Sequence, residues 1–219
     1  MYKALFLATA AAAIGLAVLP MSVATAAPAA THGVLTTSKV GGPNVRVGDV
    51  LVASLAKGTN ATFFTPGTKN GITCRTSSFT VKVVKNPNAP GTAIESLTKQ
   101  TFGKCTSAGF SEVLGVNSVT VLKTPYKTTV SDSKGNPATV FKASTKLNLK
   151  GTVGNIICVY GAAKVSGSAS NTGQVLTFTN QSFTKVSGPS VCPRSGGLTA
   201  KFGPVVDTSV KSKPHVYIN

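Results

Sequence analysis

The chain has 219 residues and carries 22 Lys and Arg against five Asp and Glu, which gives a net charge of +17. Its acidic side chains and histidines are Asp49, Glu95, Glu112, Asp132, Asp207, His32 and His215. Because acid–base chemistry needs such groups and no local spacing pairs two of the acids, this composition argues against a hydrolase. An abundance of Thr, Ser, Val and Gly favours strands and tight turns over helices.

The N-terminus has the layout of a secretory signal peptide. Lys3 precedes an uncharged apolar run over residues 4–19, and the sequence ATA at 24–26 forms an A-x-A cleavage site. We predict that residues 1–26 are removed, that residues 27–42 form a flexible mature N-terminus, and that the product is secreted with no membrane span. A retained membrane anchor is the alternative interpretation. Removal of Lys3 with the leader lowers the net charge from +17 to +16.

The remaining residues, 43–219, alternate apolar and polar side chains with the period of two that is typical of strands. Phe79, Val81 and Val83 share one face of a predicted strand, and another strand is predicted at 119–122. Turn-forming sequences recur between such segments, among them NPNAPG at 86–91 and SGSASNTG at 166–173. We therefore predict a single all-β domain, an antiparallel β-sandwich or a Greek-key barrel.

The turn sequence DSKGNP at 132–137 predicts a hairpin between a strand at 128–130 and a long strand at 139–150. In the long strand, Lys142, Lys146 and Lys150 share one face. The apolar residues predicted on its opposite face are Phe141, Ala143, Leu147 and Leu149. This lysine stripe is a candidate anion-binding surface, and the alternative interpretation is a solvated face or an edge that lysine protects against aggregation.

The four cysteines are Cys74, Cys105, Cys158 and Cys192. An even number of cysteines in an exported protein predicts disulfides. A zinc site is the competing interpretation, but such sites use close C-x-x-C pairs with histidines nearby, and this chain has neither. We predict no metal and no cofactor.

An internal repeat chooses among the three possible disulfide pairings. The matching segments are ITCR at 72–75 with IICV at 156–159, and LTKQTF at 97–102 with FTNQSF at 178–183. Each copy, over about 70–106 and 154–193, is interpreted as a Cys-bearing strand, a second strand, a turn, a returning strand and a closing Cys. The repeat predicts Cys74–Cys105 and Cys158–Cys192, each worth roughly 3 to 4 kcal/mol through loop closure. Chance similarity among Thr-rich strands is the alternative explanation.

One catalytic arrangement can be drawn from the C-terminal residues, His215 with Asp207. No G-x-S-x-G elbow accompanies it, and the sequence DTS at 207–209 resembles the tripeptide of aspartic proteases only in a single copy. We interpret residues 207–209 as a turn beside a strand, and we predict no catalytic residues.

Several short motifs carry a resemblance to a known group of proteins. They are TNQSF at 179–183, SGP at 187–189 followed by CP at 192–193, PVVDT at 204–208 and VYIN at 216–219. With these motifs the chain, over about 43–219, resembles an actinobacterial family of uncharacterised secreted proteins that are often labelled only by their export signal. The resemblance implies secretion and no established activity. The chain departs from that pattern in its strong positive charge and in lacking a twin-arginine signal.

The excess of lysine predicts a secreted, non-enzymatic binding or structural module that associates with anionic cell-wall polymer or with another extracellular protein. Only Arg46, Arg75 and Arg194 are arginines, and aromatic residues are not interleaved with the basic ones, so specific nucleic-acid binding is not expected. One alternative is an exported inhibitor or toxin-like effector that presents the disulfide-closed loop at 187–197. A hydrolase is the third function considered.

Overall fold

Thirteen strands and no helix make up the part of the chain that the structure, a computed structural model, describes: residues 31–219. The strands are β1 (Leu35–Thr37), β2 (Val50–Ser54), β3 (Ala61–Phe64), β4 (Gly71–Lys85), β5 (Thr92–Ala108), β6 (Val113–Val121), β7 (Tyr126–Ser131), β8 (Pro137–Gly151), β9 (Asn155–Ser170), β10 (Val175–Ser187), β11 (Ser195–Phe202), β12 (Val206–Asp207) and β13 (Val216–Ile218). The predicted signal peptide lies outside the described residues. Over residues 31–219 there is no helix with the length and apolar character needed to span a membrane.

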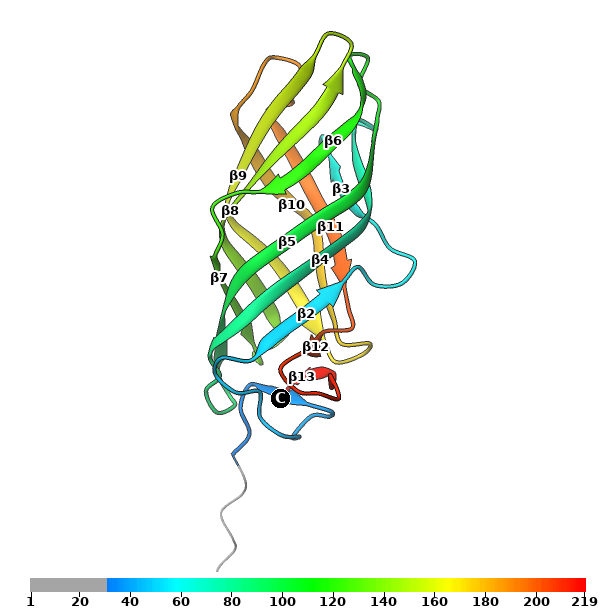
Figure 1. The fold of residues 1–219 in the computed structure, drawn as a ribbon. Helices are drawn as coiled ribbons and strands as arrows, with labels where there is room; N and C mark the ends of the chain where they lie inside the picture. The colour runs from blue at the N-terminus through cyan, green and yellow to red at the C-terminus, as the bar shows by residue number, and fades with distance from the viewer. Residues whose placement is uncertain (1–30) are drawn as a thin grey trace, which may run out of the picture. The chain divides into compact units, whose positions relative to one another are not determined.

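Eight of these strands close into an antiparallel barrel, as Figure 1 shows. Around the barrel the order is β3, β4, β5, β7, β8, β9, β10, β11, and β11 then pairs with β3. The all-β prediction and its barrel alternative are confirmed. Neighbours in the barrel follow chain order, so the path is a meander and not a Greek key, and hairpin turns make most of the connections.

Two places in the barrel wall are each shared by a pair of short strands. Along β8, the first part pairs with β7 and the part at 145–151 pairs with β6. Along β4, residues 71–74 pair with β3 and residues 78–82 pair with β2. The long strands β4 and β8 therefore each pair, along one edge, with two shorter strands in succession (Figure 1).

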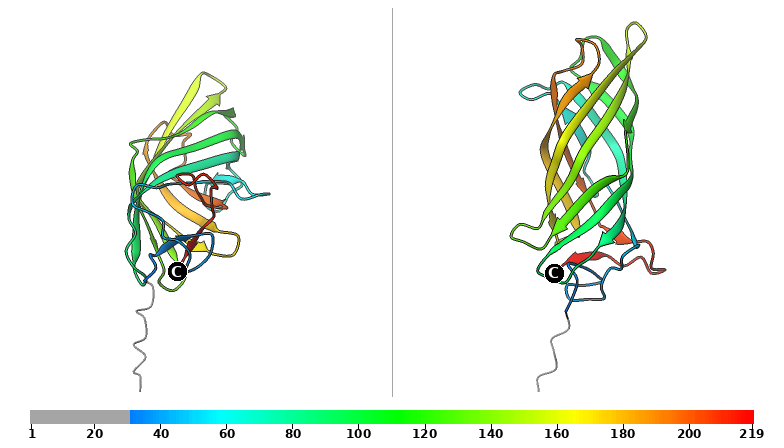
Figure 2. Two further views of the ribbon diagram at one scale, coloured as in Figure 1. Left: turned by 60° about the horizontal axis from the view of Figure 1, so that its bottom comes forward. Right: turned by 90° about the vertical axis from the view of Figure 1, so that its left-hand side faces the viewer.

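A small sheet of β1 and β13 covers one end of the barrel, which we call the plugged end (Figure 2, blue and red). Val34 and Leu35 are buried there, at 0% and 2% exposure. Asn86 holds this segment: its Oδ1 accepts from the Leu35 N–H at 2.9 Å, and its Nδ2 donates to the carbonyls of Leu35 and Val45 at 2.8 Å. Gly33 leaves room for Asn86, since a Cβ on Gly33 would lie 2.7 Å from the Asn86 amide.

The plugged end corrects one prediction from the sequence. Residues 27–42 were expected to be a flexible terminus, but those that the structure describes, from 31 onward, belong to the folded unit that spans Thr31–Asn219. The composition of this segment is polar and glycine-rich, which is typical of a flexible terminus. Its hydrogen bonds, however, go to distant residues, Asn86 and Asn219, that local patterning does not reveal.

Apolar side chains fill the interior of the barrel. Phe79, Val81 and Val83 are buried on one face of β4, as the alternation predicts. Phenyl rings meet edge to face, for example Phe79 with Phe202 at 5.3 Å between centroids. Such pairs add about 0.5–1.5 kcal/mol beyond the area they bury.

The predicted hairpin of β7 and β8 is confirmed, but the alternation along β8 changes phase at Lys142, which the sequence pattern did not predict. Phe141 pairs with Lys164 and Ala143 pairs with Ala162, so the register with β9 is unbroken, but Lys142 between them has a φ of +58°. Val140 and Ala143 both line an interior cavity, so odd and even residues exchange faces at this point. Ala143 and the residues after it that were predicted to face inward do so, but Phe141 faces outward, which corrects its predicted position. A second correction concerns the predicted turn at 166–173, because β9 continues as far as Ser170.

The two predicted disulfides are confirmed. Cys74 and Cys105 are direct cross-strand partners on β4 and β5. Cys158 on β9 bonds to Cys192, which lies in the loop between β10 and β11. Both predicted copies of the repeat fold as long hairpins, β4–β5 and β9–β10, and in each copy the disulfide ties the first strand to the chain that returns beside it.

Candidate functional site

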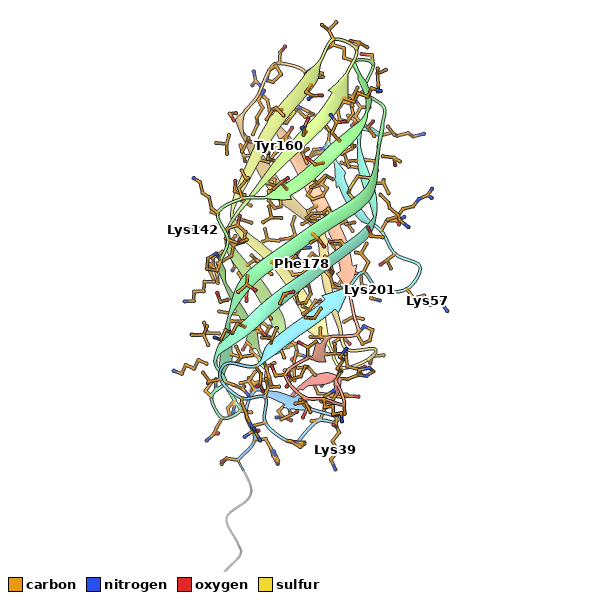
Figure 3. The ribbon with its side chains drawn as sticks, viewed as in Figure 1. Lys39, Lys57, Lys142, Tyr160, Phe178 and Lys201 are labelled. Carbon is orange, nitrogen blue, oxygen red and sulfur yellow. A yellow bond between two sulfur atoms is a disulfide. The ribbon has the colours of Figure 1, made fainter. Side chains whose placement is uncertain are left out.

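The basic side chains lie on the outside of the barrel. All Lys and Arg residues within 31–219 are exposed except Lys146 and Lys185, which are half-buried. Figure 3 shows Lys39, Lys57 and Lys142 projecting away from the molecule in different directions. The positive charge therefore surrounds the barrel.

The acidic side chains are mostly engaged by neutral donors. Asp49 accepts a hydrogen bond from the Arg46 N–H at 2.8 Å, and Asp132 accepts two from the Gly91 N–H at 2.9 and 3.0 Å. Two further acids are withdrawn from the surface, Glu95 at 7% exposure and Asp207 at 1%. Glu112 is the one acid that is fully on the surface with an exposed side chain. The external positive charge is thus barely offset by carboxylates.

The lysine stripe predicted on β8 is divided by the change of phase at Lys142. Lys146 and Lys150 lie on the outer face, opposite the buried Leu147 and Leu149. Lys142 lies at the change of phase, where its φ is positive, and projects outward (Figure 3). The three lysines therefore lie on the exterior, as predicted, but Lys142 is not in regular alternation with the other two.

The outward position of Phe141 creates a cluster that the sequence did not reveal, consisting of Lys127, Phe141, Lys142 and Lys164, which we call the basic–aromatic cluster. Phe141 pairs with Lys164 across β8 and β9, and the ammonium group of Lys127 lies 5.7 Å from the centre of the Phe141 ring. A cation over an aromatic face is worth about 0.5–1 kcal/mol at an exposed site. Lys127 and Lys164 are far apart in sequence, so only the strand register brings them together.

A polar groove of about 260 Å³ lies beside the end of β2. It is lined by Ser54, Leu55, Arg75, Thr76, Ser77, Ser78 and Thr101. Within it, Ser78 and Thr101 join their hydroxyls at 2.8 Å, and Gln100 donates to the Ser77 hydroxyl at 2.9 Å. Arg75 is the charged group that this groove presents.

The interior of the barrel contains four small cavities in a row, and adjacent cavities share lining residues such as Phe63, Phe178 and Phe79. Their volumes are about 40, 40, 50 and 70 Å³. Sites for small organic ligands usually measure about 300–1,000 Å³. The interior is therefore a packed core with minor voids, and not a site that could take a lipid or cofactor.

Glu95 is the ionisable group of this core. It lines the two cavities nearest the plugged end, and its Oε2 accepts a hydrogen bond from the Thr128 hydroxyl at 3.2 Å. Burial raises the pKa of Glu95 to about 7, although the Thr128 hydrogen bond acts in the opposite direction. No second titratable side chain lines these cavities, so Glu95 has no partner for acid–base chemistry.

The arrangement drawn from Asp207 and His215 is not assembled as a catalytic pair. Asp207 ends β12 and accepts a hydrogen bond on its Oδ1 from the Ser209 N–H at 2.9 Å, so residues 207–209 form the turn predicted from the sequence. His215 is exposed and bridges to Val206 through its backbone. The acid that lies beside Asp207 is Asp49, which raises the pKa of Asp207 in addition to the larger effect of burial.

The disulfide-closed loop at 187–197 is held against the barrel. The Tyr160 hydroxyl donates to the Pro193 carbonyl at 3.0 Å, and the Lys185 ammonium donates to the carbonyls of Cys192 at 3.0 Å and Pro189 at 3.2 Å. Cys192 is buried at 1% exposure. Only residues 187–190 form a continuous exposed stretch, so this loop offers a partner a short contact surface.

No family model, curated protein or solved structure matches the chain. The resemblance to an actinobacterial secreted family stays a prediction from the sequence motifs.

Proposed function

We propose that this protein is an exported, non-enzymatic module that binds anionic cell-wall polymer through the lysine-rich outside of its barrel. The observation that supports this most directly is the separation of charge. The lysines are exposed, whereas Glu95 and Asp207 are buried and the carboxylates of Asp49 and Asp132 accept hydrogen bonds from backbone N–H groups. A surface of this kind attracts polyanions from any direction.

The type of cation favours a flexible polymer over a rigid, precisely shaped ligand. Lysine presents a hydrated point charge on a flexible stem, without the planar fork that arginine uses to grip a phosphate or carboxylate in fixed geometry. Many weak contacts of this kind add up along a chain of repeating negative charges. We expect the affinity to depend strongly on salt, because the screening length falls from about 10 Å at 0.1 M to about 3 Å at 1 M.

The basic–aromatic cluster is the best-defined contact on this surface. Lys142 and Lys164 are exposed beside the half-buried Phe141, and Lys127 lies over its ring. An apolar ring surrounded by ammonium groups suits a polymer in which sugar rings alternate with phosphate or carboxylate groups. The ring packs against the apolar face of a sugar, and the lysines meet the charges.

Co-sedimentation with purified cell wall across a salt series tests the proposal. We expect retention at 0.05 M salt, progressive release toward 1 M, and loss of retention when the anionic polymers are stripped from the wall. The variant Lys142→Glu/Lys164→Glu should release at lower salt than Lys57→Glu/Lys201→Glu. The second pair makes the same change of charge away from the cluster, since Lys57 and Lys142 project from opposite sides in Figure 3.

Two results would contradict the proposal. Retention that persists at 1 M salt would mean that charge does not drive binding. Equal retention on intact and stripped wall would mean that the anionic polymers are not the partner. If the two double variants release at the same salt concentration, binding is charge-driven but the basic–aromatic cluster has no special part in it.

A further inference from the structure

Two of the five carboxylates lie together at the plugged end. Asp49 immediately precedes β2, and Asp207 ends β12, which pairs antiparallel with β2. Asp207 is the direct partner of Leu51, and residues two apart on a strand share a face. Asp49 and Asp207 are therefore diagonal neighbours on one face of this strand pair. Two carboxylates this close repel each other unless a cation or a proton neutralises their charge.

The hydrogen bonds leave part of this pair unpartnered. Asp207 is 1% exposed, and while its Oδ1 accepts from the Ser209 N–H, its buried Oδ2 has no hydrogen-bond partner. It is the one buried side-chain oxygen or nitrogen without a partner among the residues that the structure describes. Buried polar atoms are normally satisfied, so an orphaned carboxylate oxygen indicates a missing partner.

The side chains near Asp207 Oδ2 offer carboxylate and hydroxyl oxygens, which can serve as ligands for a metal ion. Asp49 uses its Oδ2 to accept from the Arg46 N–H at 2.8 Å, which leaves its other oxygen free of backbone donors. The Ser209 hydroxyl oxygen accepts from the Val50 N–H at 2.8 Å and lies in the same turn as Asp207. Carboxylate and hydroxyl oxygens are hard donors, which Ca²⁺ prefers, and Ca²⁺ tolerates irregular geometry with water in its remaining positions.

The site is open to solvent on one side. Asp49 is half-buried and Ser209 is exposed, whereas Asp207 lies behind them. Water and ions can therefore approach from the Asp49 side. No group of three or more His, Cys, Asp or Glu side chains gathers anywhere in residues 31–219, so a metal here depends on the two carboxylates with hydroxyl and water ligands.

We propose that Asp49 and Asp207 bind one Ca²⁺ ion at the plugged end of the barrel, with the Ser209 hydroxyl as a third protein ligand. The ion satisfies the buried Oδ2 and neutralises two adjacent negative charges. It also ties β12 to the segment before β2, which secures the plugged end. With two carboxylates as its only charged ligands, the site belongs with the weaker extracellular class, whose dissociation constants are about 0.1–1 mM.

Calorimetric titration of the signal-cleaved protein with CaCl₂, after removal of metal with a chelator, tests the proposal at constant pH. We expect one bound Ca²⁺ per chain. At a Ca²⁺ concentration ten times the dissociation constant, the midpoint of thermal unfolding should rise by about 3 to 6 °C. Asp49→Asn and Asp207→Asn should abolish both responses. Glu112→Gln is the matched control, because it removes one exposed carboxylate elsewhere and should leave both responses unchanged.

The proposal is overturned if the wild-type protein neither binds Ca²⁺ nor gains thermal stability from it. It is also overturned if Asp49→Asn responds to Ca²⁺ like the wild type, or if Glu112→Gln removes the response. If Asp207→Asn fails to fold because that side chain is buried, the Asp49→Asn variant still tests the proposal, because Asp49 is only half-buried. A protein that ignores Ca²⁺ but becomes more stable at low pH, with Asp49→Asn removing that gain, would assign the pair a shared proton in place of a metal.

Discussion

Replacing Glu95 with Gln should make the protein more stable at neutral and alkaline pH. The buried carboxyl lines an apolar core, and its hydrogen-bonding neighbour is the Thr128 hydroxyl. Gln has nearly the same shape and can still accept from Thr128 through its amide oxygen. The substitution therefore removes the charge while the packing and the hydrogen bond are retained.

The size of the effect follows from the pKa of Glu95, which burial raises from 4.5 to about 7. Each pKa unit corresponds to about 1.4 kcal/mol, so the ionised carboxylate costs the folded state about 3 kcal/mol. Below about pH 4.5 the carboxyl is protonated in both states and this cost is absent. Between about pH 4.5 and 7 the unfolded chain releases the proton while the folded chain keeps it, so the free energy of unfolding falls as pH rises.

Urea unfolding of the wild type and of Glu95→Gln at intervals between pH 4 and 9 measures this effect. The two proteins should have similar free energies of unfolding at pH 4. At pH 8 the Glu95→Gln variant should be more stable than the wild type by about 3 kcal/mol. Glu112→Gln should follow the wild type, because Glu112 is exposed. Asp207, whose pKa is also raised by burial, contributes to the slope in all three proteins. A difference between wild type and Glu95→Gln that does not change with pH would refute the reasoning.

Two further predictions concern the disulfide and the hydrogen bonds that hold the barrel together. Cys158→Ala/Cys192→Ala should lower the free energy of unfolding by about 3 to 4 kcal/mol relative to the wild type, with both proteins measured by urea unfolding under oxidising conditions. Asn86→Ala removes three hydrogen bonds to the segment around Leu35 and should lower stability by about 2 to 3 kcal/mol. Amide hydrogen exchange should then be faster in β1 but unchanged in β9, and equal exchange in both strands would show that Asn86 has no local role.

The disulfide pairing could be predicted because it follows from local features. A repeated pattern of strand, turn and strand implies a hairpin, and a hairpin brings its first and last cysteines together without any knowledge of distant contacts. Closure of the sheet is different, because it depends on β3 pairing with β11 and β5 pairing with β7. Nothing in the local alternation distinguishes a closed barrel from a sandwich, so both remained open at the level of sequence.

The outward position of Phe141 is indicated by a change in the spacing of the apolar residues along β8. Ala138 and Val140 are apolar at even positions, whereas Ala143 and Leu147 are apolar at odd positions. This change of phase coincides with the positive φ of Lys142, whereas an uninterrupted alternation over 139–150 places Phe141 on the inner face. The neighbours Lys127 and Lys164 could then have been found only from the register of β7, β8 and β9.

The positions of the acidic side chains explain why few carboxylates offset the positive charge of the surface. Glu95 lies in the core, Asp49 and Asp207 pair at the plugged end, and Asp132 receives the Gly91 N–H. Each of these acids has a structural position, so few carboxylates remain to form ion pairs with the external lysines. Binding Ca²⁺ at Asp49 and Asp207 would raise the positive charge further and would strengthen attraction to a polyanion. The two proposals are therefore linked by charge, and Ca²⁺ should increase retention on cell wall at low salt in the wild type but not in Asp49→Asn.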